Sequence, residues 1–124
     1  MKELTIFILL NICHWIGDYT HASTGWMLNA KRFGKPLPPI FVHALVHGTL
    51  FSVAIYFVYG LDKAIVGGVF QLVTHFIIDV LKGRINYWFK SVQSTANKAH
   101  WYVFGADQFM HQLVLIVTIL LLCK

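Results

Sequence analysis

Long apolar runs, interrupted by isolated polar residues, make up most of this chain. A helix needs about 20 residues to cross the hydrocarbon core of a membrane, and four runs reach that length, at about residues 4–22, 38–59, 63–82 and 102–123. Pro38 and Pro39 favour a helix start at the second run, and the turn at residues 60–62 separates it from the third. The pattern predicts an all-α fold, an antiparallel bundle of four transmembrane helices.

The composition also indicates a membrane protein. The chain is 57% hydrophobic and 12% charged, with a mean hydropathy of +0.64, whereas soluble domains carry about 25% charged residues. No small-residue cleavage site follows the first apolar run, so we expect a spanning anchor there rather than a signal peptide. Without a domain linker, residues 1–124 are expected to form one integral membrane domain.

Two longer connections join the predicted helices, one after the first and one after the third. In the second connection, Ile85, Trp88, Phe89 and Val92 repeat at helical spacing, which predicts an interfacial amphipathic helix between the third and fourth transmembrane helices. Aromatic side chains near the predicted helix ends fit a belt at the membrane interface; these are Trp26, Tyr87, Trp88, Trp101 and Tyr102.

The basic residues are distributed unevenly and predict an orientation. The net charge is +5, yet the Lys and Arg residues form no dense run, which excludes a nucleic-acid-binding surface. Seven of them lie on the side of the long connections and three on the side of the termini. Because cytoplasmic loops are enriched in Lys and Arg, we expect the long connections in the cytoplasm and both termini outside it.

Each predicted transmembrane helix carries one polar pair four residues apart. Residues with this spacing lie one turn apart on the same face of a helix. The pairs occur in the segments HWIGD, HALVH, HFIID and DQFMH, and comprise His14 and Asp18, His43 and His47, His75 and Asp79, and Asp107 and His111.

The alternating direction of the helices predicts that these eight residues form two layers. In the first, third and fourth helices, each Asp lies one turn, about 6 Å, nearer the cytoplasm than its His. The deeper layer would contain His14, His47, His75 and His111. The layer nearer the cytoplasm would contain Asp18, His43, Asp79 and Asp107.

Such residues are costly in lipid and therefore indicate a buried site. Each mid-helix Asp costs about 2.5–3.5 kcal/mol on the insertion scale, so the pairs should face the bundle interior. Imidazole and carboxylate groups bind zinc, manganese and iron, and all eight residues are candidate ligands for one or two divalent ions. Asp18, Asp79 and Asp107 are also candidate catalytic carboxylates, as a general base or as partners that orient the histidines.

Polar residues near the cytoplasmic ends of the predicted helices are candidates for substrate binding. Lys82 follows Asp79 by three residues and either binds an anionic substrate or simply extends its ammonium to the interface. Lys31 is a candidate for the same role, and Gln108 either donates to substrate or caps a helix start. Together these residues predict a membrane-embedded metal-dependent hydrolase of a lipid or another phosphate- or ester-bearing amphiphile.

The motifs assembled so far resemble a family of small integral membrane proteins from bacteria and their phages, known only as a domain of unknown function. The resemblance rests on HWIGDY, on WM with Lys31, on HALVH, on HFIIDVLK and on DQFMH, which together span nearly the whole chain. Ala22 stands where the family usually has a glutamine. The chain is more distantly similar to bacterial inner-membrane metal-dependent hydrolases, which implies the bacterial inner membrane as its location.

Two other classes of function stay open from the residues alone. A haem or redox protein is one, because two histidines of the deeper layer could be axial ligands. The other is a proton or metal transporter, or a phage-type regulatory membrane protein, because intramembrane Asp and His residues are typical of proton paths. A pathway through so short a chain would need a homo-oligomer.

Overall fold

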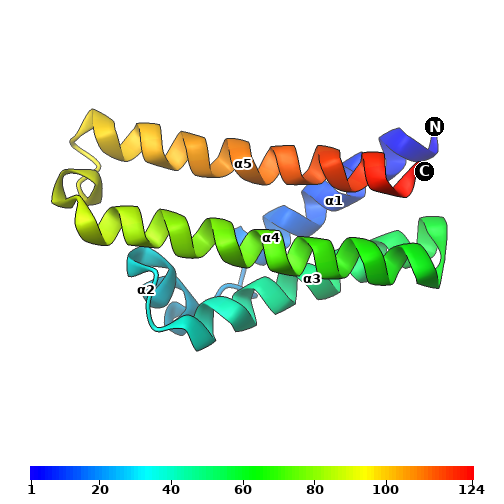
Figure 1. The fold of residues 1–124 in the computed structure, drawn as a ribbon, viewed down its shortest axis with the longest axis horizontal. Helices are drawn as coiled ribbons and strands as arrows, with labels where there is room; N and C mark the ends of the chain where they lie inside the picture. The colour runs from blue at the N-terminus through cyan, green and yellow to red at the C-terminus, as the bar shows by residue number, and fades with distance from the viewer.

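The computed structural model describes all 124 residues and contains only helices and their connections. Four long helices run antiparallel, with both termini and the α3–α4 turn at one end and the two longer connections at the other (Figure 1). The elements are α1 (Lys2–Tyr19), α2 (Gly25–Phe33), α3 (Leu37–Tyr59), α4 (Leu61–Trp88), the 3-10 turn η1 (Lys90–Gln93) and α5 (Lys98–Leu122).

Three of the four long helices, α3, α4 and α5, are long and apolar enough to cross a membrane. The prediction of four such helices is therefore confirmed for three. The exception, α1, has only 18 residues, about 27 Å at 1.5 Å per residue, and carries Lys2, Glu3 and Asp18. It ends at Tyr19 rather than at Ala22, close to the middle of the bundle (Figure 1).

A short helix that the apolar pattern did not predict, α2, follows the end of α1. Thr24 caps its first turn by accepting a hydrogen bond from the Met27 amide, and Gly34 ends it with a left-handed φ of 65°. The helix packs against α3 and α4 and buries Met27 and Ala30. Helix α2 thereby fills the space beyond the end of α1 and brings Lys31 and Arg32, in its last turn, close to the bundle.

The predicted amphipathic helix between the last two transmembrane helices does not form as a separate element. Instead α4 continues to Trp88 without a helix-breaking residue, and Phe89, with extended backbone angles, ends it. Only the four-residue turn η1 follows, and the Asn97 side chain then caps α5 by accepting from the Ala99 amide at 3.0 Å. The aromatic residues expected at the membrane interface are exposed; these are Trp26, Tyr87, Trp88, Trp101 and Tyr102.

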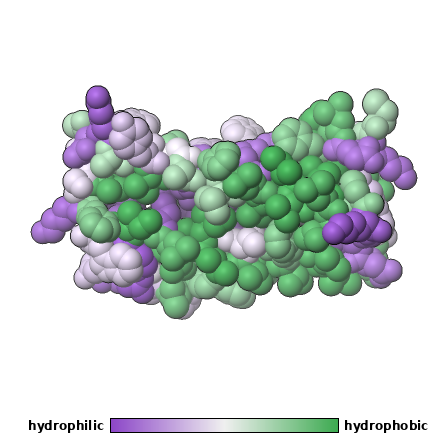
Figure 2. Space-filling model, turned by 45° about the horizontal axis from the view of Figure 1, so that its top comes forward, coloured by the Kyte–Doolittle hydropathy of each residue, from purple (hydrophilic) through white to green (hydrophobic).

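The bundle interior is apolar toward the end that holds the termini. The cluster there comprises Ile6, Leu10, Phe51, Ala54, Ile55, Ala64, Leu115 and Leu122. On the face shown in Figure 2, the surface is also apolar over the middle of the molecule, with hydrophilic side chains gathered at both ends. Such an exposed apolar surface suits contact with lipid chains. The polar pairs lie in the rest of the interior, toward the end that holds the longer connections.

Candidate metal site

Helices α1, α3 and α4 bring four ligand groups together around one carboxylate oxygen. Asp18 Oδ1 lies 2.9 Å from His43 Nε2, 3.2 Å from His47 Nε2 and 3.9 Å from His75 Nε2. The ligand atoms of these four residues all lie within 4.8 Å of one another. Ligand atoms around one tetrahedral zinc ion lie about 3.4 Å apart, given bonds of about 2.1 Å. The spacing of this first group can therefore hold a metal ion.

A second group adjoins the first and shares one histidine with it. His75, Asp79 and His111 also bring their ligand atoms within 4.8 Å, with His75 Nε2 3.3 Å from Asp79 Oδ2 and His111 Nε2 3.8 Å from Asp79 Oδ1. A ring nitrogen has one lone pair, so His75 can serve only one ion at a time. If His75 serves the second group, each group retains three ligands.

The hydrogen bond behind His111 favours the tautomer that binds metal. His111 Nδ1 donates to the backbone carbonyl of Asp107 at 2.8 Å; since a carbonyl can only accept, the lone pair is on Nε2, which faces Asp79. Behind His75, the amide nitrogen of Gln71 lies 3.3 Å from Nδ1 and donates to it. Metal binding at His75 Nε2 would require the Gln71 amide to present its oxygen instead, so that Nδ1 donates.

Replacing Gln71 by leucine is expected to weaken zinc binding by about ten- to a hundredfold, because removing such an outer partner loosens the ring that holds the metal. The measurement is zinc affinity by competition with a chelating dye. The matched control is Gln112→Leu, whose amide donates to Asn11 at 3.2 Å, apart from the cluster. Equal affinities in the two variants would contradict the role of Gln71.

Buried atoms without partners show that the groups fit a cation. His75 Nε2, His111 Nε2 and both carboxylate oxygens of Asp79 are buried and make no hydrogen bond within the protein, although such atoms normally have a partner; only Asp79 Oδ2 has a cation nearby, the Lys31 ammonium at 3.3 Å. A metal ion would satisfy them together. Haem fits poorly, because neighbouring rings of the five clustered histidines lie only 3.7–5.8 Å apart between centroids.

Two of the eight predicted ligands lie beside the groups rather than in them. His14 Nε2 is 3.4 Å from Asp18 Oδ2, and its ring packs against His111 with the centroids 5.1 Å apart. Asp107 turns away from the ligand groups, since its Oδ2 accepts from Gln108 at 3.0 Å and lies 3.8 Å from Lys82 Nζ. Helical spacing placed these residues on the correct face but did not specify their exact direction.

Lys31, predicted to bind substrate, reaches the ligand groups from α2. Its Nζ lies 3.0 Å from Asp18 Oδ1, 3.3 Å from Asp79 Oδ2 and 2.9 Å from His43 Nε2. Burial lowers the pKa of Lys31, but the negative charges of Asp79 and Asp18 outweigh it, and the pKa is raised. Lys31 therefore stays charged and partly balances the two buried carboxylates.

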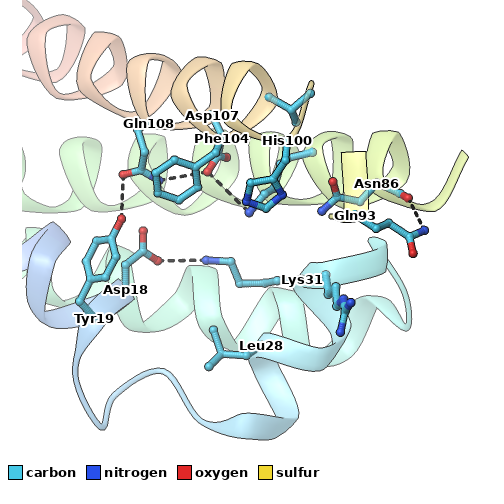
Figure 3. Close-up of a pocket in the computed structure, with 13 residues that line it drawn as sticks. Asp18, Tyr19, Leu28, Lys31, Asn86, Gln93, His100, Phe104, Asp107 and Gln108 are labelled. Carbon is cyan, nitrogen blue, oxygen red and sulfur yellow. Dashed lines mark hydrogen bonds and ion pairs between the residues drawn. The ribbon is translucent and has the colours of Figure 1, made fainter. Parts of the chain in front are cut away.

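A pocket of about 370 Å³ opens beside the groups, between α1, α2, α4, η1 and α5 (Figure 3). The three predicted substrate residues, Lys31, Lys82 and Gln108, all line it together with Asp18 and Asp107. Arg32, a basic residue that the sequence also offered for a phosphate-bearing head group, lines the pocket as well, whereas sequence reasoning missed four other polar residues of the lining, which are Tyr19, Asn86, Gln93 and His100. A helical signal existed for Asn86, which follows Lys82 by one turn, and for His100, which precedes Asp107 by two.

The role of Gln108 becomes specific in this pocket. It lies well inside α5, so the alternative that it caps a helix start is wrong. Its Oε1 accepts from the Tyr19 hydroxyl at 3.2 Å and its Nε2 donates to Asp107 at 3.0 Å, as the dashed lines in Figure 3 show. Gln108 thus links α1 to α5 and positions the carboxylate of Asp107.

Comparison with known proteins agrees with the family resemblance in the motifs. No curated protein and no solved structure matches the chain. The sequence model of one family matches residues 6–124, which include all four polar pairs and the whole pocket. On this match, the chain belongs to the family described as "Protein of unknown function (DUF3307)".

Proposed function

We propose that this protein is a membrane-embedded metal-dependent hydrolase that acts on a phosphate- or ester-bearing amphiphile. The observation that carries the proposal is a pair of buried His/Asp groups directly beside an open pocket with cationic walls. When bound, a divalent ion such as zinc, manganese or iron polarises a carbonyl or phosphoryl oxygen and makes water more acidic. The remaining chemistry is assigned to side chains of the chain itself.

The ligand groups suggest one or two ions for each chain. Asp18, His43 and His47 would hold one ion once the Lys31 ammonium, 3.0 Å from Asp18 Oδ1 and 2.9 Å from His43 Nε2, moves aside. His75, Asp79 and His111 would hold another. Three protein ligands leave a coordination position open, as catalytic zinc sites require, whereas structural sites are closed by four. A single ion held by Asp18 and the three histidines of the first group would be the closed alternative.

Asp107 is the carboxylate best placed to act as a general base. It lies outside both ligand groups and lines the pocket. Its Oδ1 is buried, 3.6 Å from His111 Nδ1, whereas Oδ2 accepts from Gln108 on the pocket side. A carboxylate oxygen has two lone pairs, so Oδ2 could also accept a proton from a water molecule in the pocket. Lys82 and Arg32 on the same walls would bind the anionic part of the substrate.

The polar interior opens at one end of the bundle only, which favours a reaction site over a path across the membrane. The pocket opens at the end of the bundle that holds α2 and η1, whereas the apolar cluster around Phe51, Ile55 and Leu115 occupies the interior toward the termini. A proton or metal path through one chain would have to cross that apolar cluster. Transport and phage-type regulation are therefore the weaker proposals and would call for a homo-oligomer.

The proposed location is the bacterial inner membrane, with the pocket facing the cytoplasm. The support is the distribution of basic residues, seven of which belong to the pocket end of the chain and three to the other end. Positive residues are retained on the cytoplasmic side of membrane proteins. In this orientation both termini lie outside the cytoplasm.

The test is hydrolysis of phospholipid vesicles and of soluble nitrophenyl esters and phosphates by protein loaded with zinc, manganese or iron. Asp107→Asn should lower the rate by at least about a hundredfold, since general acid–base catalysis contributes at least that much, while bound metal stays at the wild-type level. The control is Gln112→Leu, which should leave the rate unchanged. Absence of hydrolysis by metal-loaded wild-type protein, with every metal and substrate, would overturn the proposal.

A further inference from the structure

A second hollow lies on the outer face of the bundle, between α4 and α5. It measures about 240 Å³, and its walls are almost entirely apolar. The apolar lining consists of Ile78, Leu81, Ile85, Val103, Ala106 and Met110. Leu81 and Met110 are half exposed there, on two helices that are long and apolar enough to span a membrane. We call this hollow the α4–α5 groove.

The α4–α5 groove and the polar pocket meet at shared residues. Lys82, Asp107 and Val103 line both hollows, and Lys82 Nζ lies 3.8 Å from Asp107 Oδ2 across the gap between the helices. This ion pair is long, and the Lys82 side chain keeps 24% of its surface exposed. A partner with stronger acceptor oxygens could therefore take the ammonium from Asp107.

The α4–α5 groove fits an apolar group, whereas the pocket fits an anionic one. A groove of aliphatic side chains at membrane depth is filled most favourably by hydrocarbon. The pocket carries the cations Lys31, Arg32 and Lys82, of which Lys31 already contacts Asp18 and Asp79 and partly balances their charges. Arg32, and Lys82 with its long contact to Asp107, are the cations left for an anion with several oxygens, and a phosphate group suits them best.

We propose that the substrate is a phospholipid that enters sideways from the bilayer, with an acyl chain in the α4–α5 groove and its phosphate in the pocket. The inference rests on the proposed function and specifies the substrate class of that same site. Lys82 is the positioning residue at the boundary, since it reaches the phosphate from a helix whose neighbouring residues, Leu81 and Ile85, hold the chain. The lipid would then reach the pocket from the bilayer without passing through water.

The test is photo-crosslinking with a phosphatidic acid that carries a diazirine in one acyl chain, in phosphatidylcholine vesicles. Peptide mass spectrometry should place the crosslinks on Leu81, Ile85 and Met110. Ala106→Trp fills the α4–α5 groove and should lower this labelling at least tenfold. Leu120→Trp, which introduces the same large side chain at another exposed position of α5 outside the groove, should not alter it.

The head group is tested with the same reaction. Lys82→Ala, or a diacylglycerol probe without the phosphate, should lower groove labelling several-fold, and free glycerol phosphate should compete poorly because it lacks the chain. Labelling spread evenly over the exposed faces of α3, α4 and α5, and unchanged by Ala106→Trp, would overturn the inference. Groove labelling without hydrolysis would refute the hydrolase alone, whereas lipid hydrolysis unaffected by Ala106→Trp would refute the groove alone.

Discussion

Replacing His75 by alanine is expected to remove the zinc ion of the second ligand group and to weaken zinc binding by the first. His75 belongs to both ligand groups, so its loss leaves the first group with three ligands and the second with two. His111→Ala leaves the first group with all four ligands and should therefore bind its remaining ion more tightly than His75→Ala does. The affinity loss in His75→Ala should exceed the roughly ten- to hundredfold loss caused by removing an outer partner. Elemental analysis of the detergent-purified, zinc-loaded protein measures the number of zinc ions bound per chain, and competition with a chelating dye measures the affinity.

The matched control for this experiment is His21→Ala, which removes the same side chain from an exposed position near the end of α1. It should keep the wild-type metal content. Circular dichroism must show equal helix content in both variants, because a buried ring is lost in only one of them. Wild-type zinc content in a folded His75→Ala variant would show that the shared position does not bind metal.

The centre of the site could be predicted from the sequence because two simple rules act there. Residues four apart share a helix face, and antiparallel helices bring such pairs to matched depths. Both rules hold whatever the details of packing, so residues from all four pairs do meet in the bundle interior. Six of the eight predicted ligands fall into the two groups.

The remaining features depend on packing and could not be deduced in the same way. The direction of Asp107 toward the pocket follows from its partners Gln108 and Lys82, on α5 and α4, and no periodicity encodes that choice. The position of Lys31 depends on α2, a nine-residue helix too short for an apolar pattern to predict. Its signals were local, namely a Thr24 cap and a Gly34 stop.

The early end of α1 explains why α2 matters for the site. Asp18 lies in the last turn of α1, so a continuous spanning helix would have covered the ligand groups with its own next turn. The chain instead leaves the bundle there and returns as α2, which inserts Lys31 between Asp18 and Asp79 and lines the pocket with Leu28. The pocket therefore exists because the first helix is short.

A second large effect is expected from Gly83→Ala, at the contact that holds α2 in place. A Cβ atom added at Gly83 would lie 2.2 Å from the amide nitrogen of Gly34 and 2.5 Å from the carbonyl oxygen of Lys31. Both atoms are backbone, so no side-chain rotation can relieve the clash, and α2 must shift as a whole. The overpacking should destabilise the protein by about 1–3 kcal/mol, which exceeds the gain of about 1 kcal/mol from a better helix former.

The control is Gly105→Ala in α5, where an added Cβ meets nothing within 4 Å. It gains the helix propensity without the clash and should stabilise the protein by about 0.5–1 kcal/mol. The two variants make the same chemical change, but only Gly83→Ala creates a clash. The melting temperature in detergent should therefore fall in Gly83→Ala and rise in Gly105→Ala. Trypsin should also cleave after Arg32 faster in Gly83→Ala alone, because only there is α2 displaced. Equal melting temperatures and cleavage rates would mean that α2 does not rest on α4, and that Lys31 reaches the carboxylates in another way.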